Sequence, residues 1–397
     1  MTETIGGLES AAEPEEEARR FAHFPCFDGY RAIAVTGVVL LHVAFASGFM
    51  YRHPSLGGYL FNADFGVSLF FMISGFLLYR PFATSHMAGR PGPAVRPYFR
   101  RRALRILPAY WVALTVVVYV LHQQHIHSLK EFLLLYGLLQ IYSEPYHFHG
   151  IQQAWSLGTE VSFYVFLPLY AASVRRLSVG VRARHRLALE LGLVALLCAI
   201  GLASRFVLMT ARGEDTYSLT TLPVYLDLFA LGMGLAVLSA WDASRSTPAP
   251  CLAAMGRRPW LWCLVAVAAY WTVVNRLDIP INYKTPLTPG QWVARDGLFG
   301  VAAVCLLVPG VFGPQSRGGV RRFLRLRPVQ WLGMVSYGVY LWHEAAIDLY
   351  QHWTHTRFFT GAFPLMLTGT AAITLAIAVA SYFVVERPAL RLKGPRA

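Results

Sequence analysis

Apolar runs of about 20 residues recur along this chain of 397 residues and leave few folds open to it. A helix needs about 20 mostly apolar residues to cross a bilayer. Only 14% of the residues are charged, whereas a soluble domain carries roughly a quarter. The pattern predicts an all-α polytopic membrane protein with about ten transmembrane helices. We expect these spans near 31–50, 61–80, 103–121, 155–174, 187–210, 219–240, 258–275, 294–313, 330–350 and 361–385.

Short basic clusters between the runs predict the orientation, because cytoplasmic loops collect Lys and Arg. An eleventh apolar run, 132–142, is about half the length of a span. If it does not cross, every cluster lies on the side of the N-terminus. We therefore expect cytoplasmic termini and a short re-entrant or interfacial segment near 131–142, beside a cavity. The clusters are Arg90, Arg96, Arg100, Arg101, Arg102 and Arg105; Arg175, Arg176, Arg182, Arg184 and Arg186; Arg245, Arg257 and Arg258; Arg317, Arg321, Arg322, Arg325 and Arg327; and Arg387, Arg391, Lys393 and Arg396.

This organisation predicts one large domain between two tails. Residues 1–26 form a polar acidic cytoplasmic tail, 27–390 the transmembrane domain and 391–397 a basic cytoplasmic tail. The net charge of +14 does not indicate a nucleic-acid binder, because the basic residues separate apolar segments. The five cysteines contain no CxxC pair, so no metal framework is expected.

Ionisable residues inside predicted spans are costly and mark functional sites. Arg31 stands at the predicted cytoplasmic start of the first span, and His42 follows eleven residues later. That is close to three turns, so both project from one face about 16 Å apart. They predict a polar path for an anionic ligand. Alternatively, Arg31 reaches the headgroups and His42 bonds a neighbouring helix. The full set is Arg31, His42, Asp64, Glu160, Arg205, Asp227, Asp296, His343 and Glu344, of which Asp227 is interpreted as structural support.

Six motifs occur in order along nearly the whole chain. They are FDGYRAIAV (27–35) followed by His42, GVSLFFMISGFL (66–77), YFRRRALRILPAY (98–110), WSLGTEVSFY (155–164), VSYGVYLWH (335–343) and VERP (385–388). Together they resemble acyltransferase family 3, a family of polytopic membrane O-acyltransferases. Two positions depart from its pattern. Val161 replaces a frequent second carboxylate after Glu160, and Ser68 replaces a frequent aspartate, so the expected chemistry depends more heavily on Glu160.

The resemblance implies acyl transfer from a coenzyme A thioester to a hydroxyl. His42 is then the predicted base, since an imidazole titrates near working pH. Glu160 is the candidate that orients His42; a structural hydrogen bond is its rival role. Asp28 is a third carboxylate near this path, although it suits capping of the first helix equally.

The same resemblance implies binding residues. Arg31, Arg102 and Arg105 are the candidate clamp for the donor's phosphates, because guanidinium binds phosphate bidentately. The alternative is contact with anionic lipid, which we favour for Arg100 and Arg101. The candidate substrate-binding residues are Trp155, Ser74, Tyr337 and His343, with helix packing the alternative for Ser74 and interfacial anchoring for the others.

The expected function is therefore an O-acyltransferase in the cell membrane. Acyl-CoA, most simply acetyl-CoA, is the expected donor, with no metal. The acceptor is a sugar, a glycolipid or a hydroxylated natural product. The alternative is a transporter or flippase for an anionic substrate. Such transporters often contain two related halves with paired broken helices, and no duplication is visible in this sequence.

Overall fold

The computed structural model describes residues 24–213, 217–281, 285–315 and 317–392. These residues form helices joined by loops, with no strand among them, which confirms the all-α prediction. Most of the predicted acidic tail (1–26), and Lys393 and Arg396 of the predicted C-terminal tail, lie outside the described residues.

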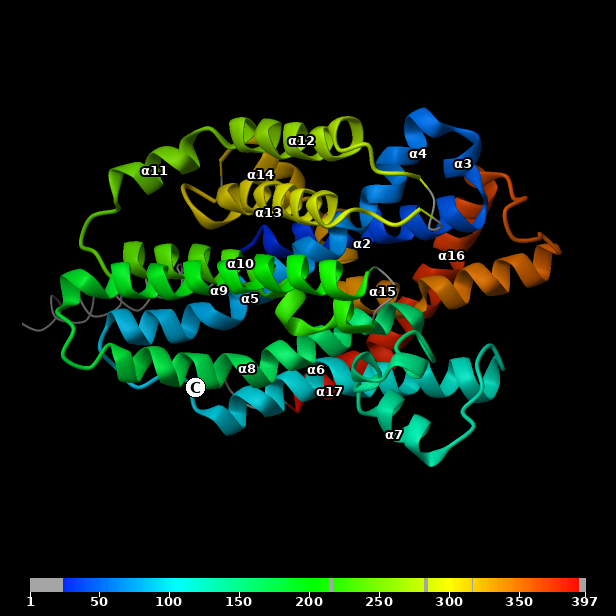
Figure 1. Ribbon diagram of the computed structural model, residues 1–397, viewed down its shortest axis with the longest axis horizontal. Coiled ribbons are helices and arrows are strands. Elements are labelled where there is room, and N and C mark those ends of the chain that lie inside the picture. Colours follow the sequence, from blue (N-terminus) through cyan, green and yellow to red (C-terminus); the bar gives the residue numbers. More distant parts are fainter. Residues whose placement is uncertain (1–23, 214–216, 282–284, 316, 393–397) are drawn as a thin grey trace, which may run out of the picture.

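The long helices run roughly along the longest axis of the molecule (Figure 1). They are α2 (Phe27–Ala46), α5 (Phe65–Met87), α6 (Val95–Thr115), α8 (Trp155–Leu177), α9 (Ala183–Arg212), α10 (Leu222–Ala243), α12 (Pro259–Arg276), α13 (Pro289–Val311), α15 (Arg327–Thr354) and α16 (Phe363–Ser381). Short helices are α3 (Phe49–Arg52), α4 (Pro54–Phe61), α7 (Leu129–Tyr136), α11 (Pro250–Arg257), α14 (Gly319–Leu324) and α17 (Arg387–Arg391). The π-helical turns η2 (Val116–Val120) and η7 (Tyr382–Glu386) extend α6 and α16, and the 3₁₀ turns are η1 (Asn62–Asp64), η3 (Gln140–Tyr142), η4 (Glu144–Tyr146), η5 (Gln152–Ala154) and η6 (Tyr217–Thr220).

Eight helical segments in the described part of the chain are long and apolar enough to cross a membrane. They contain α2, α5, α6, α8, α9, α10, α13 and α16, so the protein is a multi-pass membrane protein. The remaining two predicted spans coincide with α12 and α15. α15 is less apolar because it carries His343, Glu344 and Asp348. A count of ten spans stays a prediction.

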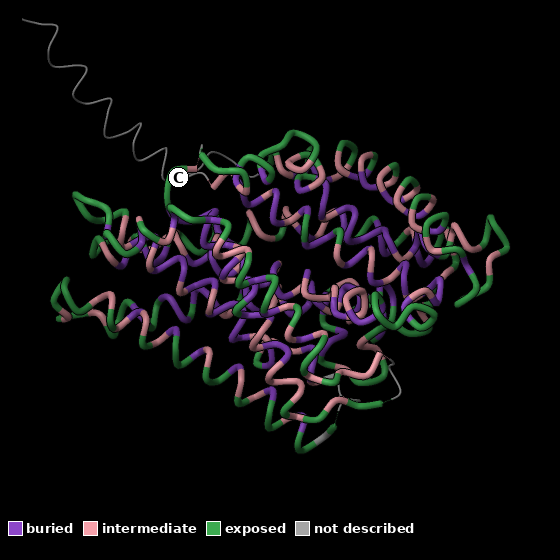
Figure 2. Tube along the Cα trace, turned by 90° about the horizontal axis from the view of Figure 1, so that it is seen from above, coloured by how far each residue is buried: buried purple, intermediate pink, exposed green. Residues whose placement is uncertain are grey.

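The peripheral helices present apolar side chains outward, as a bilayer requires. Leu169, Val207, Val267 and Leu365 are each more than half exposed. Buried residues concentrate along the middle of the molecule, whereas the outward faces of its outer helices are exposed (Figure 2). A soluble protein places its charges on the surface and its apolar side chains inside. This protein has an apolar outer surface and carries charges in its interior, as described below.

The short apolar run forms α7, whose eight residues extend only about 12 Å and cannot span a bilayer. Its first turn is capped by Ser128, whose hydroxyl accepts a hydrogen bond from the Glu131 backbone N–H. The Glu131 carboxylate accepts bonds from the backbone N–H of His127 and from His149 Nδ1. Burial opposes ionisation of this carboxyl, but the hydrogen bonds prevail and lower its pKa.

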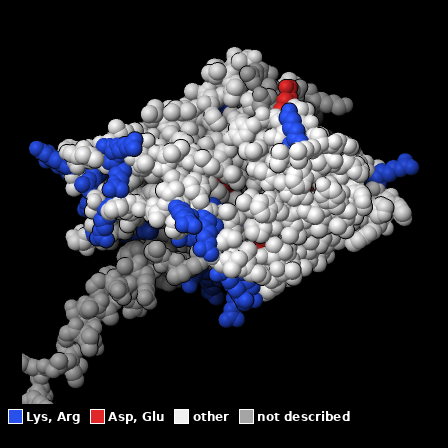
Figure 3. All heavy atoms as spheres, turned by 90° about the horizontal axis from the view of Figure 1, so that it is seen from below, with Lys and Arg blue, Asp and Glu red and all other residues white. Residues whose placement is uncertain are grey.

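The arginine-rich segments gather at one end of the molecule, where hydrogen bonds join them. Arg100 donates to the Leu392 carbonyl, Arg186 to the carbonyls at the end of α5, and Arg321 to Gly256. Figure 3 shows most of the Lys and Arg side chains of one face near that end, beside a broad uncharged area. This is the distribution expected for one membrane side. Its assignment to the cytoplasm stays a prediction.

Two glycines let α5 and α10 approach closely. A Cβ added at Gly75 would overlap the backbone carbonyl of Phe229, and one added at Gly232 would overlap that of Met72. The Phe71 and Phe229 rings stack beside this contact, 4.7 Å apart. Small residues permit such backbone contact between membrane helices. Gly232 therefore has a packing role.

Replacing Gly232 by alanine is expected to push α10 away from α5 and to lower stability by about 1–3 kcal/mol, the usual cost of overpacking. Thermal unfolding of the purified protein in detergent measures the effect. Gly192→Ala is the matched control, because a Cβ at Gly192 meets no atom within 4 Å. Equal midpoints for the two variants would contradict the packing role.

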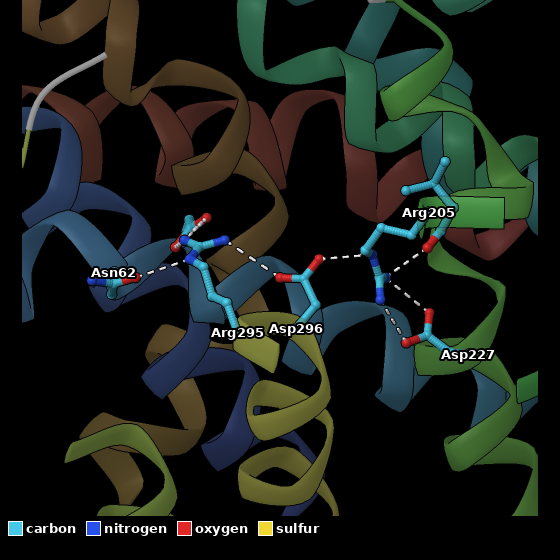
Figure 4. A network of polar contacts seen from close by, with 7 residues as sticks. Asn62, Arg205, Asp227, Arg295 and Asp296 are labelled. Carbon is cyan, nitrogen blue, oxygen red and sulfur yellow. Dashed lines mark hydrogen bonds and ion pairs between the residues drawn. The ribbon is translucent and has the colours of Figure 1, made fainter. Parts of the chain in front are cut away.

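A chain of charges, buried except for the partly exposed Asp64, ties α9, α10, α13 and η1 together (Figure 4). Arg205 lies 3.0 Å from Asp227 and 3.0 Å from Asp296. Arg295 lies 3.4 Å from Asp296 and 2.5 Å from Asp64. Each charge thus has an opposite partner, which a low-dielectric interior demands. This places Asp227 in a structural network, as the sequence indicated.

Candidate active site

Two cavities lie along α2, and both contain residues predicted from the sequence. The first, called the arginine cavity, has a volume of about 110 Å³. It is lined by Arg31 of α2, Arg102 and Arg105 of α6, Glu160 of α8, and the polar residues Ser74, Ser156, Tyr164, Ser336, Tyr337 and Tyr340, with apolar side chains between them. It has an excess of positive charge, which suits an anionic ligand.

The three arginines differ in their partners. Arg31 is held by Asp28 at 2.6 Å. Arg105 faces the buried Glu386 at 3.8 Å and lies over the Tyr337 ring. Arg102 lies over the Tyr164 ring, its buried Nε has no hydrogen-bond partner, and it makes no ion pair within the described residues. Arg102 is thus the arginine most available to a ligand.

Glu160 belongs to this first cavity. Ser74 of α5 donates a hydrogen bond to Glu160 Oε1. Ser74 therefore links α5 to α8 at the cavity wall. A carboxylate among three arginines balances part of their charge.

The second cavity, called the histidine cavity, has a volume of about 200 Å³. Its lining residues are His42, Phe45, Ala46, Val117, Gln123, Gln124, Gly150, Ile151, Gln152, Gln153, Leu341, Glu344, Ala345, Ile347, Asp348 and Phe358. The segment after α7 contributes Gly150 to Gln153 to this lining, whereas no residue of the short run 131–142 does. The predicted cavity therefore lies beside residues 150–153 and not beside the short run.

The hydrogen bonds of His42 fix its tautomer. His42 Nδ1 lies 2.8 Å from the Val38 carbonyl, which can only accept, so Nδ1 carries a proton. In the same way, His343 Nδ1 donates to the Tyr340 carbonyl at 2.8 Å. His343 Nε2 is then an acceptor, 3.3 Å from His42 Nδ1. The second nitrogen of His42, Nε2, remains for chemistry.

Glu344 is the carboxylate that meets this free nitrogen. Its Oε1 lies 3.2 Å from His42 Nε2. Glu160, the carboxylate predicted from the sequence to orient His42, lies in the other cavity and accepts a hydrogen bond from Ser74. Glu344 was visible as an intramembrane carboxylate directly after the last histidine motif. Sequence alone did not show which carboxylate faces His42.

His42, His343 and Glu344 are also the residues that come closest to a metal site. In the described part of the chain, they form the one group of three potential ligands whose donor atoms lie within 4.8 Å of one another. Because His42 Nδ1 donates to the Val38 carbonyl, Nε2 is the nitrogen that His42 could offer to a metal. Hydrogen bonds to the Val38 and Tyr340 carbonyls also hold the two imidazole rings in place.

A thin polar layer divides the two cavities. The hydroxyls of Ser156 and Tyr340, which line the arginine cavity, lie 2.7 Å apart, and each lies 3.1 Å from the Gln153 carbonyl. Gln153 lines the histidine cavity, and its Nε2 donates to the Tyr340 and Leu341 carbonyls at 3.0 Å. The cavities are thus adjacent.

The structure groups the predicted residues unequally. The arginine cavity is lined by Arg31, Arg102, Arg105, Glu160, Ser74 and Tyr337, and the histidine cavity by His42. His343 lines neither cavity, but its Nε2 lies 3.3 Å from His42 Nδ1. Trp155 lines neither cavity: its ring packs 5.4 Å from Tyr225 and 6.3 Å from Phe71.

A family model described as an acyltransferase domain matches residues 24–384. The chain belongs to this acyltransferase family. The match covers both cavities and confirms the resemblance carried by the six motifs.

Curated relatives resemble the chain over most of its length. It is 26% identical to YrhL of Bacillus subtilis (strain 168), whose name as a peptidoglycan O-acetyltransferase is provisional, over 94% of this chain and 56% of YrhL. It is 23% identical to the peptidoglycan O-acetyltransferase OatA of Listeria monocytogenes, over 82% of this chain and 50% of OatA. The chain therefore spans little more than half of these relatives. No solved structure matches it.

Proposed function

We propose that the protein is an O-acyltransferase of the plasma membrane. It moves an acyl group, acetyl or another short chain, from cytoplasmic acyl-CoA to a hydroxyl of a sugar, glycolipid or hydroxylated natural product. The observation that carries the proposal is the adjacency of a cationic cavity and a histidine–carboxylate cavity on one helix.

The arginine cavity suits the donor. Coenzyme A offers a diphosphate and a ribose phosphate, and guanidinium groups bind phosphate oxygens bidentately. Arg31, Arg102 and Arg105 line this cavity and supply these groups. The acyl end of the donor then has to pass the layer formed by Ser156 and Tyr340 to reach His42.

The histidine cavity suits the transfer itself. The acceptor hydroxyl forms a bond to the acyl carbon while the carbon–sulfur bond breaks. The hydroxyl proton passes to His42 Nε2 and from there to the coenzyme A thiolate. Glu344, 3.2 Å from that nitrogen, stabilises the imidazolium formed midway.

The relatives support an acetyl donor and a glycan acceptor. The Listeria protein is named for O-acetylation of peptidoglycan. We propose the same kind of transfer for this chain, to a hydroxyl-bearing sugar or natural product.

The direct test incubates the protein in nanodiscs with radiolabelled acetyl-CoA and a panel of hydroxylated acceptors. Label on an acceptor supports the proposal. Coenzyme A binding is measured by calorimetry on the same samples. If the protein neither transfers label nor binds coenzyme A, the proposal is overturned. A transporter for an anionic substrate then becomes the better explanation.

Replacing Arg102 by alanine is expected to weaken coenzyme A binding about 10–100-fold, because a hydrogen bond to a charged group contributes roughly 1.5–3 kcal/mol. The affinity is also expected to become less sensitive to salt. Arg101→Ala is the matched control, because Arg101 does not line the cavity. Equal losses from both variants would assign the effect to general surface charge.

A further inference from the structure

The histidine cavity differs from the arginine cavity in the sign of its charge. Its ionisable lining residues are His42, Glu344 and Asp348, and no Lys or Arg lines it. Glu344 lies 3.2 Å from His42 Nε2. Asp348 is the acidic group of the cavity that has no such neighbour. Its carboxylate makes no ion pair or hydrogen bond within the described residues.

Glu344 and Asp348 lie four residues apart on α15 and so face the cavity from the same side, one turn apart. Two carboxylates in this position repel a phosphate or a carboxylate that enters. Repulsion of this kind is strong where water is partly excluded. The cavity thus discriminates against anions, whereas the arginine cavity attracts them.

A buried acceptor in the same wall lacks a partner. The Gln153 side chain is 4% exposed, and its Nε2 is committed to the Tyr340 and Leu341 carbonyls. Its Oε1 has no hydrogen-bond partner. A buried unpaired acceptor is costly, and a hydroxyl donor from a ligand would satisfy it.

The rim adds features suited to a sugar. The side-chain amides of Gln124 and Gln152 are exposed and make no hydrogen bond within the described part of the chain. The Phe358 ring is 49% exposed and packs 5.4 Å from Phe45. Sugar rings present hydroxyl donors at their edges and C–H groups on their faces, which such amides and rings contact.

We infer that the histidine cavity binds an uncharged, hydroxyl-rich group and excludes anionic ones, and that Asp348 sets this selectivity. The identification of this group as the acyl acceptor rests on the proposed function. The charge selectivity of the cavity is independent of that function and is tested separately.

The test places a cysteine at the cavity rim by Phe358→Cys and measures its reaction with cationic and anionic methanethiosulfonates. Rates are corrected for the parent chain, which contains native cysteines, and for the reaction of each reagent with 2-mercaptoethanol. The cationic reagent is expected to react at least about tenfold faster than the anionic one. Equal rates, or faster reaction of the anionic reagent, would overturn the inference.

Asp348→Asn in the Phe358→Cys chain is the matched control. It keeps the size of the side chain and removes its charge, so the ratio of the two rates is expected to fall several-fold. The same experiment with Gln152→Cys guards against a local effect of losing Phe358. An unchanged ratio at both positions would remove Asp348 from the inference.

An acceptor panel then connects selectivity to transfer. Uncharged saccharides are paired with their phosphate or uronate counterparts and offered with labelled acetyl-CoA. Wild-type protein is expected to label the uncharged members, and Asp348→Lys to raise transfer to the anionic ones about tenfold or more. Equal labelling of both by wild type contradicts the inference alone. Loss of acetyl-CoA binding contradicts the proposed function alone, because the thiol rates are independent of it.

Discussion

Replacing His42 by alanine is expected to slow acyl transfer about 10²–10⁴-fold, the contribution of a positioned general base. Coenzyme A binding is expected to remain, because His42 lines the histidine cavity and the arginines line the other. Single-turnover transfer from labelled acetyl-CoA measures the rate, and calorimetry measures the binding. Transfer at the wild-type rate in the variant would exclude His42 as the base.

Two carboxylate variants separate the possible partners of His42. Glu344→Gln keeps the shape of the side chain but cannot stabilise an imidazolium, so we expect a large loss of rate and an altered pH profile. Glu160→Gln is expected to change the KM for the donor and to leave the pH profile in place, since Glu160 bonds Ser74. The reverse outcome would favour the original pairing of His42 with Glu160.

A chelator provides a further control for the same cluster. EDTA is expected to leave the transfer rate unchanged, because His42 and His343 are placed by hydrogen bonds to Val38 and Tyr340. Activity lost with EDTA and regained with zinc would instead identify His42, His343 and Glu344 as metal ligands.

The sequence predicted the helices well because each long apolar run is a local signal. All ten expected ranges are largely helical. Hydrogen bonds join several of the arginine-rich segments, while the orientation in the membrane stays a prediction. α15 shows the limit of the signal: the charges of Glu344 and Asp348 lower its hydropathy. Charged residues of a candidate site reduce the apolar character of a helix, and apolar character is the signal by which a span is recognised.

Contacts between spans could not be predicted in the same way. The spacing of Arg31 and His42 follows from one helix, and both do line cavities. The partner of His42 depends instead on how α15 and α8 are rotated and shifted against α2. Side-chain packing sets those positions, so the sequence, which favoured Glu160, could not show that Glu344 faces His42.

Removing Arg205 is expected to cause the largest loss of stability. Arg205 is 0% exposed and lies between Asp227 and Asp296. Arg205→Met leaves both carboxylates buried with fewer partners, and breaking such an arrangement costs about 3–5 kcal/mol. Thermal unfolding in detergent, followed by size-exclusion chromatography, measures the loss, with the exposed Arg245→Met as control.

A double variant tests whether charge, rather than shape, causes the loss. Arg205→Met with Asp227→Leu removes one charge of each sign and leaves Asp296 beside Arg295 at 3.4 Å. It is expected to be more stable than Arg205→Met alone, because replacing a buried ion pair by apolar groups costs far less than breaking it. A double variant less stable than the single one would exclude this explanation.

The same network supports the site at a distance. Arg205 and Asp227 fix α9 against α10, α10 packs on α5 through Gly75 and Gly232, and α5 supplies Ser74 to Glu160 in the arginine cavity. The network residues line neither cavity. Variants of Arg205 should therefore reduce the amount of folded protein while the folded fraction keeps its rate of transfer. A lower rate per folded molecule would instead show that the position of α5 limits catalysis.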